Sequence, residues 1–526
     1  MAGAAASRNK LKQTDTSGSG IMWTSFLILS GCVAVNSFLT NSLCRFARCG
    51  VVMLAALSVV GNGWANDLPE LGEAARNELS PQVERRIGES IMNEIRQREP
   101  SYIDDPEIND YLARLGRRLV EASANPTGNF HFFAIRDNAV NAFAMFGGYI
   151  GVNTGTLLTA QSESELAGVV AHEIAHVTQN HLVRQIAKEK QNTLPSLVAM
   201  AVGILAARSN SSAAAGIITG AQAGVVQAQL AYTRDFEREA DREGYRILDK
   251  AGYDVRGMGD FFERLQKAGR LYENNAPVYL RSHPLTVERL SDMQNRAEES
   301  PYRQVVSHLD FYLIRAKLRA FNGTPREAVA DFDTLVREKK FASAAAARYG
   351  MAVAQMRAKD ATAAQREMDA LQALKVSSPL IAGLAAEVRL ALKDNAGALV
   401  IYREALQRFS QAKSLVYGYA EALYAGQHFE QALVFLESQI QLSFADSRLY
   451  ALQAKTYAAQ GRRLQQHRAQ AEAYILLGQL GAAVEQLQYA QQATDGNFYE
   501  QSAVDARLRE LRQLQAEEAK QKRGGW

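Results

Sequence analysis

Two histidines and a glutamate stand at a spacing that suits metal-assisted hydrolysis. Residues 171–176 read AHEIAH, which contains the pattern His-Glu-x-x-His. On a helix, His172 and His176 lie one turn apart on the same face, so both imidazoles can reach one tetrahedral ion. Zinc lowers the pKa of a bound water, and Glu173 could take the released proton and pass it to a leaving amine. The trio therefore predicts a zinc site with Glu173 as its acid/base.

A third ligand is needed, because two histidines alone hold zinc poorly. His181 is close in sequence, but at about 100° per residue it lies about 180° from His172 around one continuous helix. It would then face away from the ion. We therefore predict that His181 is a surface or packing residue.

A second helical segment offers the third ligand. Residues 232–248 read YTRDFEREADREGYRIL and place Glu237 and Asp241 four residues apart on one face. This spacing suits a carboxylate ligand followed by a carboxylate that orients a ligand histidine or the catalytic water. Glu239 lies about 200° away around the helix, which favours Glu237. The alternative is a charged, solvated helix face, and spacing alone does not separate the two.

The metal-binding pattern needs a helix beneath it, and the surrounding residues predict one. Residues 162–190 have a helical pattern, and Ser162 with Glu165 forms a Ser-x-x-Glu capping box at its start. The His-Glu-x-x-His pattern therefore falls inside one long predicted helix.

Helices and strands are also predicted ahead of this helix. Residues 80–97 and 105–122 each begin with an N-cap residue followed by proline, which indicates two helices. Residues 130–154 then alternate and contain many aromatics and glycines, which predicts short strands. Gly147 and Gly148 indicate a turn or bulge between them.

Alanines recur in pairs twelve residues apart in the second half of the chain. The pairs are Ala316/Ala328, Ala352/Ala364, Ala386/Ala398 and Ala420/Ala432. Successive pairs are 36, 34 and 34 residues apart, and a 34-residue helix-turn-helix period is typical of tetratricopeptide repeats. Ala454 continues this spacing, and residues 471–490 predict a further helix pair out of step with it. The alternative is a generic helical bundle.

Residues 193–230 are almost free of charge and rich in small side chains. Neither of their two apolar pieces reaches the roughly 20 residues that a membrane span needs. We predict two buried or lid-forming helices joined by a loop. The alternative is a hairpin that makes peripheral contact with a membrane or a partner surface.

The composition and the N-terminal residues bear on partners and compartment. The 526 residues suffice for two or more domains, and the basic residues are spread along a chain of net charge +3, which argues against a nucleic-acid partner. Residues 45–65 contain two arginines, an apolar run and Gly-Trp-Ala, which indicates a secretory signal peptide and a mature start near Asn66.

The three cysteines, Cys32, Cys44 and Cys49, precede this predicted start, so the exported chain would suit an oxidising compartment. The apolar stretch around Cys32 has two interpretations. One is a start codon assigned too early. The other is a membrane anchor or a lipoprotein processing site at Cys32.

Three motifs together resemble a known family. HEIAH at 172–176, TRDFEREAD at 233–241 and SHP at 282–284 occur in this order. They resemble the gluzincin metallopeptidases, which include the CAAX prenyl proteases and the HtpX-type membrane proteases. With a signal peptide ahead and repeats behind, the chain is most similar to periplasmic members of this family, from about residue 80 to 490. The resemblance implies a mainly α fold with a small β-sheet: a zincin-type metalloprotease domain followed by an α-solenoid of tetratricopeptide repeats.

The resemblance also implies roles for individual residues. It makes Glu237 the third ligand of one Zn²⁺ per chain, assigns acid/base catalysis to Glu173 and gives Asp241 a supporting role in proton handling. It places His283 near the metal, as a transition-state contact or as a fourth ligand that silences the site. It implies that an extended substrate lies along an edge strand formed by Ala142, Phe143, Ala144 and Met145.

The function implied is that of a zinc endopeptidase in the periplasm. One form of this interpretation associates the protein with the outer membrane. It would degrade misfolded or stalled outer-membrane proteins, and its repeats would dock these substrates or the outer-membrane assembly machinery. The alternative is a chaperone or scaffold with a latent protease site. The expected boundaries are 1–65 for targeting, 66–302 for the protease, 303–494 for the repeats and 495–526 for a capping helix and tail.

Overall fold

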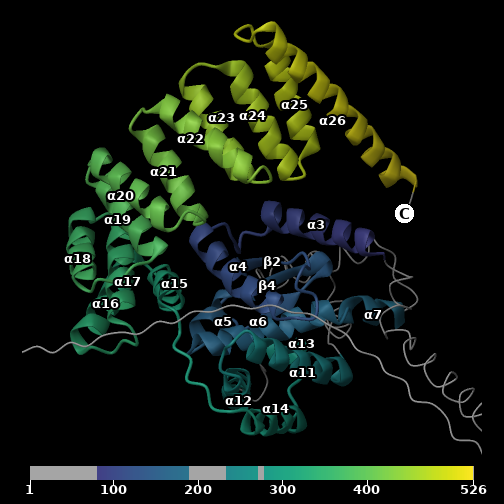
Figure 1. Cartoon of the computed structure of the whole chain (residues 1–526), viewed down its shortest axis with the longest axis vertical. Helices are drawn as coiled ribbons and strands as arrows, with labels where there is room; N and C mark the ends of the chain where they lie inside the picture. Colours follow the sequence, from purple (N-terminus) through teal and green to yellow (C-terminus); the bar gives the residue numbers. More distant parts are fainter. Residues whose placement is uncertain (1–79, 189–232, 271–277, 525–526) are drawn as a thin grey trace, which may run out of the picture. The chain divides into compact units, whose positions relative to one another are not determined.

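The computed structural model describes residues 80–188, 233–270 and 278–524 (Figure 1). The predicted signal peptide and the apolar 193–230 stretch lie outside these residues. The described residues belong to one compact unit. Within the described ranges, every helix is too short or too polar to cross a membrane.

The first two described helices begin where the sequence predicts. Helix α3 (Pro81–Arg98) follows Ser80, whose hydroxyl accepts from the backbone N–H three residues on at 3.4 Å. Helix α4 (Pro106–Glu121) follows Asp105, whose carboxylate accepts from two backbone N–H groups at 2.9 and 3.1 Å. Proline starts both helices, where its missing N–H costs no hydrogen bond.

A small four-stranded sheet has α3 on one face and, on the other face, α4 together with the helix that carries the metal-binding pattern. Its strands are β1 (Tyr102–Ile103), β2 (His131–Ile135), β3 (Ala142–Ala144) and β4 (Tyr149–Asn153). The order is β1-β2-β4-β3, with β2 and β4 parallel and the two outer pairs antiparallel. Strand β1 was not predicted, because two residues are too few to show alternation. Strand β3 is an edge strand, as the resemblance implies for this segment.

The predicted turn at Gly147 and Gly148 is present. Both residues lie in the 3₁₀ turn η1 (Phe146–Gly148) with φ of +72° and +78°, which favour glycine. A Cβ on Gly148 would also lie 2.2 Å from the Asn129 carbonyl oxygen. The turn therefore reverses the chain tightly from β3 into β4.

The prediction of one continuous helix over 162–190 is wrong, because the structure has two helices here. After the short α5 (Thr154–Thr159), helix α6 (Glu163–Thr178) ends and a separate α7 (His181–Lys188) begins. Asn180 between them has φ of 52°, a left-handed conformation that asparagine tolerates at helix ends. The predicted capping box is half formed: Ser162 caps the N–H of Glu165, but the Glu165 carboxylate accepts from the N–H of Gln161.

Four further helices complete the region that holds the metal-binding pattern. They are α11 (Arg234–Lys250), α12 (Arg256–Arg270), α13 (Val278–Ser282) and α14 (Val287–Glu299). Helices α11 and α12 pack against α6. Glycine permits the close approach, because a Cβ on Gly244 would lie 3.1 Å from the backbone nitrogen of His172.

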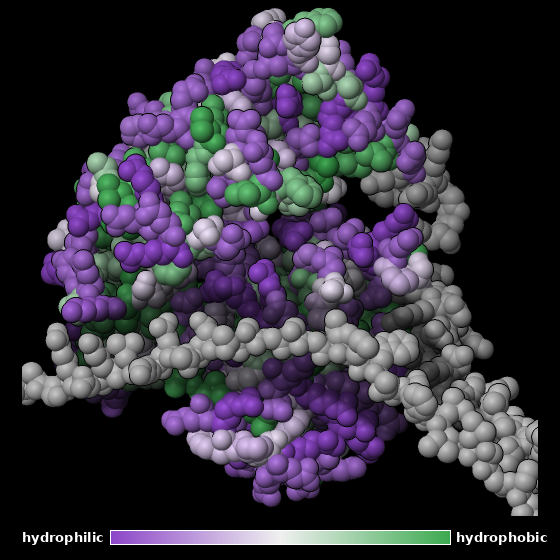
Figure 2. Space-filling model, in the orientation of Figure 1, coloured by the Kyte–Doolittle hydropathy of each residue, from purple (hydrophilic) through white to green (hydrophobic). Residues whose placement is uncertain are grey.

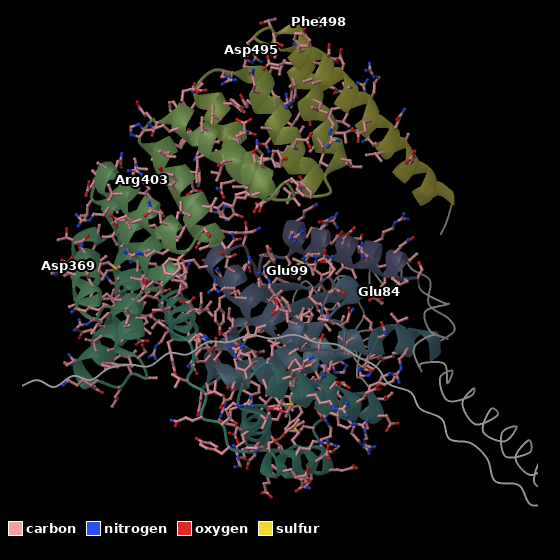
Figure 3. The ribbon with its side chains drawn as sticks, in the orientation of Figure 1. Glu84, Glu99, Asp369, Arg403, Asp495 and Phe498 are labelled. Atoms are coloured by element: carbon pink, nitrogen blue, oxygen red, sulfur yellow. The ribbon has the colours of Figure 1, made fainter. Side chains whose placement is uncertain are left out.

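The second half of the chain consists of successive antiparallel helix pairs. They are α15 (Leu309–Ala320), α16 (Pro325–Glu338), α17 (Ala344–Arg357), α18 (Ala361–Ala373), α19 (Pro379–Ala391), α20 (Asn395–Arg408), α21 (Lys413–Ala425), α22 (Phe429–Leu442), α23 (Ser447–Ala459), α24 (Arg463–Leu476), α25 (Leu480–Gln492) and α26 (Phe498–Gly524). All eight paired alanines are buried on the first eight of these helices. Asp495, labelled in Figure 3, caps α24 by accepting from the N–H groups of Arg463 and Leu464.

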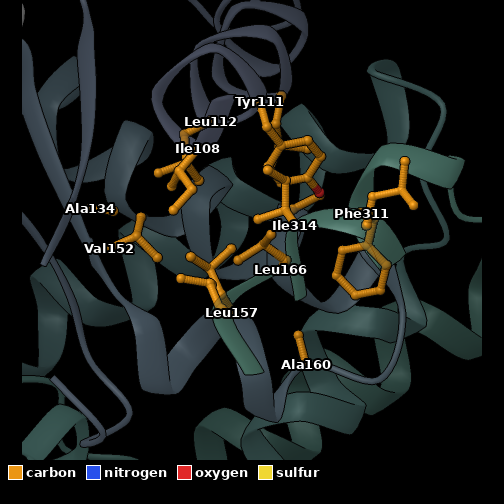
Figure 4. Packing of buried hydrophobic residues seen from close by; sticks show 14 of the residues in the cluster. Ile108, Tyr111, Leu112, Ala134, Val152, Leu157, Ala160, Leu166, Phe311 and Ile314 are labelled. Carbon is orange, nitrogen blue, oxygen red and sulfur yellow. The ribbon is translucent and has the colours of Figure 1, made fainter. Parts of the chain in front are cut away.

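One hydrophobic core joins the metal-binding region to the first repeats. It runs from Ile103 to Val388, and Figure 4 shows Phe311 and Ile314 of α15 near Leu166 of α6. On the face shown in Figure 2, hydrophilic side chains predominate, with hydrophobic patches over the repeat helices. The continuous core fixes helices α4, α6 and α15 against one another.

Candidate metal centre

Four side chains from three separate segments meet in the interior. His172 and His176 come from α6, Glu237 comes from α11, and His283 follows α13 directly. All four are buried, with 2% exposure or less, and their ligand atoms lie within 4.8 Å of one another. The sequence separated these residues by up to 111 positions, and the packing of α11 and α13 on α6 brings them together.

The distances within this cluster suit a small cation. The Nε2 atoms of His172 and His176 lie 3.0 Å apart, and each lies 3.5 Å from one oxygen of Glu237. Ligands held at about 2.0–2.2 Å from a tetrahedral zinc are separated by about 3.3–3.6 Å. Two imidazole lone pairs facing each other at 3.0 Å also need a cation or a proton between them. The donor set therefore fits a metal ion.

His283 lies beside both acidic members of the site. Its Nδ1 is 2.9 Å from Glu237 Oε1, and its Nε2 is 3.5 Å from Glu173 Oε1. Its ring stacks on Tyr279 at a centroid distance of 4.6 Å. His283 is thus near enough to serve as a fourth ligand.

Asp241 and Arg289 hold the ligand residues from behind. Asp241 Oδ1 lies 3.0 Å from Nδ1 of His172, so its carboxylate can orient that imidazole. The guanidinium of Arg289 donates two hydrogen bonds to Asp241, at 2.6 and 2.8 Å, and lies 2.7 Å from Glu237 Oε2. It also donates to the carbonyl of Pro284 at 2.7 Å, which ties the His283 segment to α11. The alternative of a solvated acidic face is wrong for Glu237 and Asp241, since both are buried.

Glu173 stands next to the cluster without belonging to it. It is fully buried, and the backbone of Ala144 and the nearby His283 are among the groups that favour its charged form. Burial raises its pKa, because a charged carboxylate is poorly solvated there. A buried acceptor with a raised pKa is suited to taking up and releasing a proton.

The ligand residues differ in how readily they hold a proton. Burial alone would raise the pKa of Glu237, but the charge of His283 and hydrogen bonds from three histidines lower it well below its usual value. Burial lowers the pKa of His176 to about 3. Burial would also lower that of His172, yet contacts with Asp241 and then Glu237 raise it to about 9.

The predicted placement of His181 on the far face of the helix is wrong, because the helix breaks before it. His181 begins α7, is fully buried and places Nδ1 at 2.9 Å from Nδ1 of His176. The counting of 100° per residue failed at Asn180. After glycine, asparagine is the residue found at the left-handed position that ends a helix, so Asn180 could have warned against one continuous helix.

The predicted substrate segment lies at one edge of the sheet. Residues Ala142–Ala144 form β3, which pairs only with β4 within the described sheet, and Met145 follows. Helix α6 packs against β3. The structure thus places this edge strand beside the helix that carries Glu173.

Sequence reasoning missed two contributors to the site, Arg289 and Tyr279. Arg289 was visible only as a basic residue six positions after His283, which by itself says nothing of its partners. Tyr279 is 1% exposed and stacks on His283 and Phe262. Neither residue stands at a sequence spacing from another residue that is typical of a metal site.

Comparisons with known proteins agree with this geometry. Residues 106–297 match the model of peptidase family M48, and residues 389–456 match a tetratricopeptide repeat model. The beta-barrel assembly-enhancing protease of Escherichia coli K12 is 32% identical over 86% of this chain and 92% of its own. That of Yersinia pestis is 31% identical over 85% and 92%. A mitochondrial metalloendopeptidase of Schizosaccharomyces pombe is 25% identical over 44% of this chain and 66% of its own.

The family match covers the segments that supply all four cluster residues, and the full-length similarity extends through the repeats. The fold is the one that the resemblance implied, a metalloprotease domain followed by tetratricopeptide repeats. The chain is therefore a metal-dependent protease and belongs to the beta-barrel assembly-enhancing proteases of peptidase family M48.

Proposed function

We propose that the protein is a zinc endopeptidase with one Zn²⁺ held by His172, His176 and Glu237. The observation that carries this proposal is the buried cluster of two facing imidazoles and a carboxylate, with Glu173 beside it. A set of imidazole nitrogens and a carboxylate oxygen suits zinc better than calcium or magnesium, which prefer oxygen ligands alone.

When bound, zinc would supply Lewis acidity for polarising water and the scissile carbonyl. The residues of the chain do the rest. Glu173 takes the proton from the attacking water and passes it to the leaving amine, which its burial and raised pKa favour. Asp241 orients His172, and Arg289 holds Asp241 and Glu237 in place through its contacts with both carboxylates.

Strand β3 would hold the substrate as an extended chain. An edge strand offers unpaired backbone groups, and a peptide that pairs with Ala142–Ala144 would run next to α6 and Glu173. Such binding recognises the main chain of the substrate and therefore favours unfolded polypeptides over folded ones.

The E. coli relative is named for enhancing beta-barrel assembly. We extend this role to the present chain: misfolded or stalled outer-membrane proteins are its substrates, and the repeats dock them or the assembly machinery in the periplasm. Repeat helices form surfaces suited to peptides and partner proteins. The domain boundaries proposed are 66–302 for the protease and 303–494 for the repeats, with 495–526 as cap and tail.

The first test is Glu173→Gln in the full chain. Cleavage of an unfolded barrel precursor with added zinc should fall by about 10²–10⁴-fold, while zinc content stays at one per chain because Glu173 is not a ligand. The matched control is Glu243→Gln on α11, whose carboxylate pairs with Arg246 on the surface, and it should cleave normally. Cleavage by Glu173→Gln at the control rate refutes the proposed mechanism.

The alternative is a chaperone or scaffold whose protease site is latent, and the same variant separates the two. If Glu173→Gln restores envelope assembly as fully as the unaltered chain, the chaperone role is favoured. His283→Ala addresses latency directly: loss of a silencing fourth ligand should raise proteolysis, whereas loss of a transition-state contact should lower it. An unchanged rate excludes both roles for His283.

A further inference from the structure

His181 lies directly behind the ligand residue His176. It is fully buried at the start of α7, and the two Nδ1 atoms are 2.9 Å apart. On its other side, Nε2 of His181 lies 3.1 Å from Glu239 Oε2. Arg184 of the same helix donates to that oxygen at 3.0 Å. A continuous chain of polar contacts therefore leads from His176 to a partly exposed carboxylate.

The proton positions along this chain follow from the role of His176. Its Nε2 faces the cluster and must be unprotonated to bind a cation, so the neutral ring carries its hydrogen on Nδ1. That N–H points at Nδ1 of His181, which must then accept. The hydrogen of His181 consequently lies on Nε2 and is donated to Glu239, an acceptor only. Each of these hydrogen bonds therefore has one donor and one acceptor.

We propose that His181 is a positioning residue of the metal centre, which fixes His176 in the tautomer and orientation that present Nε2 to the metal. This inference rests on the proposed role of His176 as a ligand. It gives the two ligand histidines different supports: His172 faces the Asp241 carboxylate directly at 3.0 Å, whereas His176 reaches Glu239 through a neutral imidazole. Partners of this kind raise the basicity of a ligand and fix its ring.

Packing is the competing explanation for His181. Its ring stacks on Phe236 at a centroid distance of 4.6 Å and an interplanar angle of 14°. A packing role depends on side-chain size and shape. The positioning role depends on an acceptor at the place of Nδ1, and substitutions can separate these requirements.

The test uses His181→Asn and His181→Gln in the full chain. The asparagine carbonyl oxygen reaches the place of Nδ1 and can accept from His176, whereas the polar atoms of glutamine reach the place of Nε2. Zinc affinity is measured by competition with a chelator at neutral pH. We expect His181→Gln to bind zinc about 10–100-fold more weakly than the unaltered chain, and His181→Asn to stay within about threefold of it.

A packing role predicts the opposite order of zinc affinities, with His181→Gln tighter than His181→Asn. The reason is that glutamine is closer to histidine in size and asparagine leaves the larger void. Thermal unfolding of the metal-free chains reports packing separately and should rank asparagine as the more destabilising change. Glu239→Gln provides a second variant at a partly exposed position and should weaken zinc binding by about 3–10-fold. Glu243→Gln on the same helix is its matched control and should leave zinc affinity unchanged.

The outcomes distinguish this inference from the assignment beneath it. If His176→Ala binds zinc as tightly as the unaltered chain, the proposed metal site fails and the positioning role fails with it. If His176→Ala loses zinc but His181→Gln binds as tightly as His181→Asn, only the positioning role is overturned. The predicted order, with asparagine tight and glutamine weak, supports both.

Discussion

Lys317 of α15 joins two acidic side chains at the start of α4, and its removal should destabilise the protein in a pH-dependent way. Its Nζ lies 2.6 Å from Glu107 Oε2 and 2.7 Å from Asp105 Oδ2. Glu107 is 8% exposed, and Tyr349 donates to the same Glu107 oxygen at 3.2 Å. Lys317→Met keeps most of the aliphatic stem and removes the charge.

The magnitude follows from the burial of Glu107. Removing one partner of a buried ion pair costs about 3–5 kcal/mol, because the other charge stays buried without compensation. Burial already raises the pKa of Glu107 above its usual 4.5, while the charge of Lys317 lowers it, so the variant should have a still higher pKa. A carboxyl with a raised folded-state pKa contributes stability below about pH 4.5 and loses it as the pH rises through the folded value. The cost of Lys317→Met should therefore be small near pH 4 and reach its full size at neutral pH.

Urea-induced unfolding of the full chain at several pH values measures this cost. Glu107→Gln combined with Lys317→Met should recover most of the loss at neutral pH, since no buried charge then remains unpaired. Lys340→Met is the matched control: Lys340 pairs with Glu338 at the surface, so its loss should cost less than about 1 kcal/mol. A loss from Lys317→Met that is equal at pH 4 and at neutral pH, or a double variant as unstable as the single one, refutes the reasoning.

Two further predictions concern other buried charges and hydroxyls. Arg289→Met leaves Asp241 and Glu237 without their guanidinium partner, so urea unfolding of the metal-free chain should show a loss of about 3–5 kcal/mol; a loss below about 1 kcal/mol contradicts the observed contacts. Burial raises the pKa of Tyr253 to about 12, so the folded protein keeps the phenol proton longer and loses about 2–3 kcal/mol of stability between about pH 10 and 12. Tyr253→Phe should lack this part of the loss of stability at alkaline pH. The prediction is contradicted if the stability of the variant depends on pH in the same way as that of the unaltered chain.

Local signals in the sequence predicted most of the secondary structure. Ser80 and Asp105, each followed by proline, mark helix starts because side-chain caps and the missing proline N–H act within one turn. The paired alanines indicate the repeats because close helix approach selects small side chains at a fixed period, and all eight are buried. The two-residue β1 escaped notice, since so short a strand carries no period.

The sequence also identified the residues that the structure brings together as a cluster. His172 and His176 were found because a metal requires particular donor atoms and a helix repeats its face every three to four residues. Glu237 was a candidate by the same spacing, and the resemblance then made it the third ligand. His283 entered through the resemblance, since a lone histidine before a proline has no spacing to interpret. The roles of these residues stay predictions until the variants above are measured.

What only the tertiary structure decided are the contacts between segments far apart in the chain. Asn180 in a left-handed conformation ends α6, and this single change of direction turns His181 from a residue on the far side of a helix into a neighbour of His176. Asp241 lies 48 positions from its partner Arg289, and Glu107 lies 210 positions from its partner Lys317. Sequence periodicity reports which side of an element is buried, but the element that covers this side depends on the packing of the whole core.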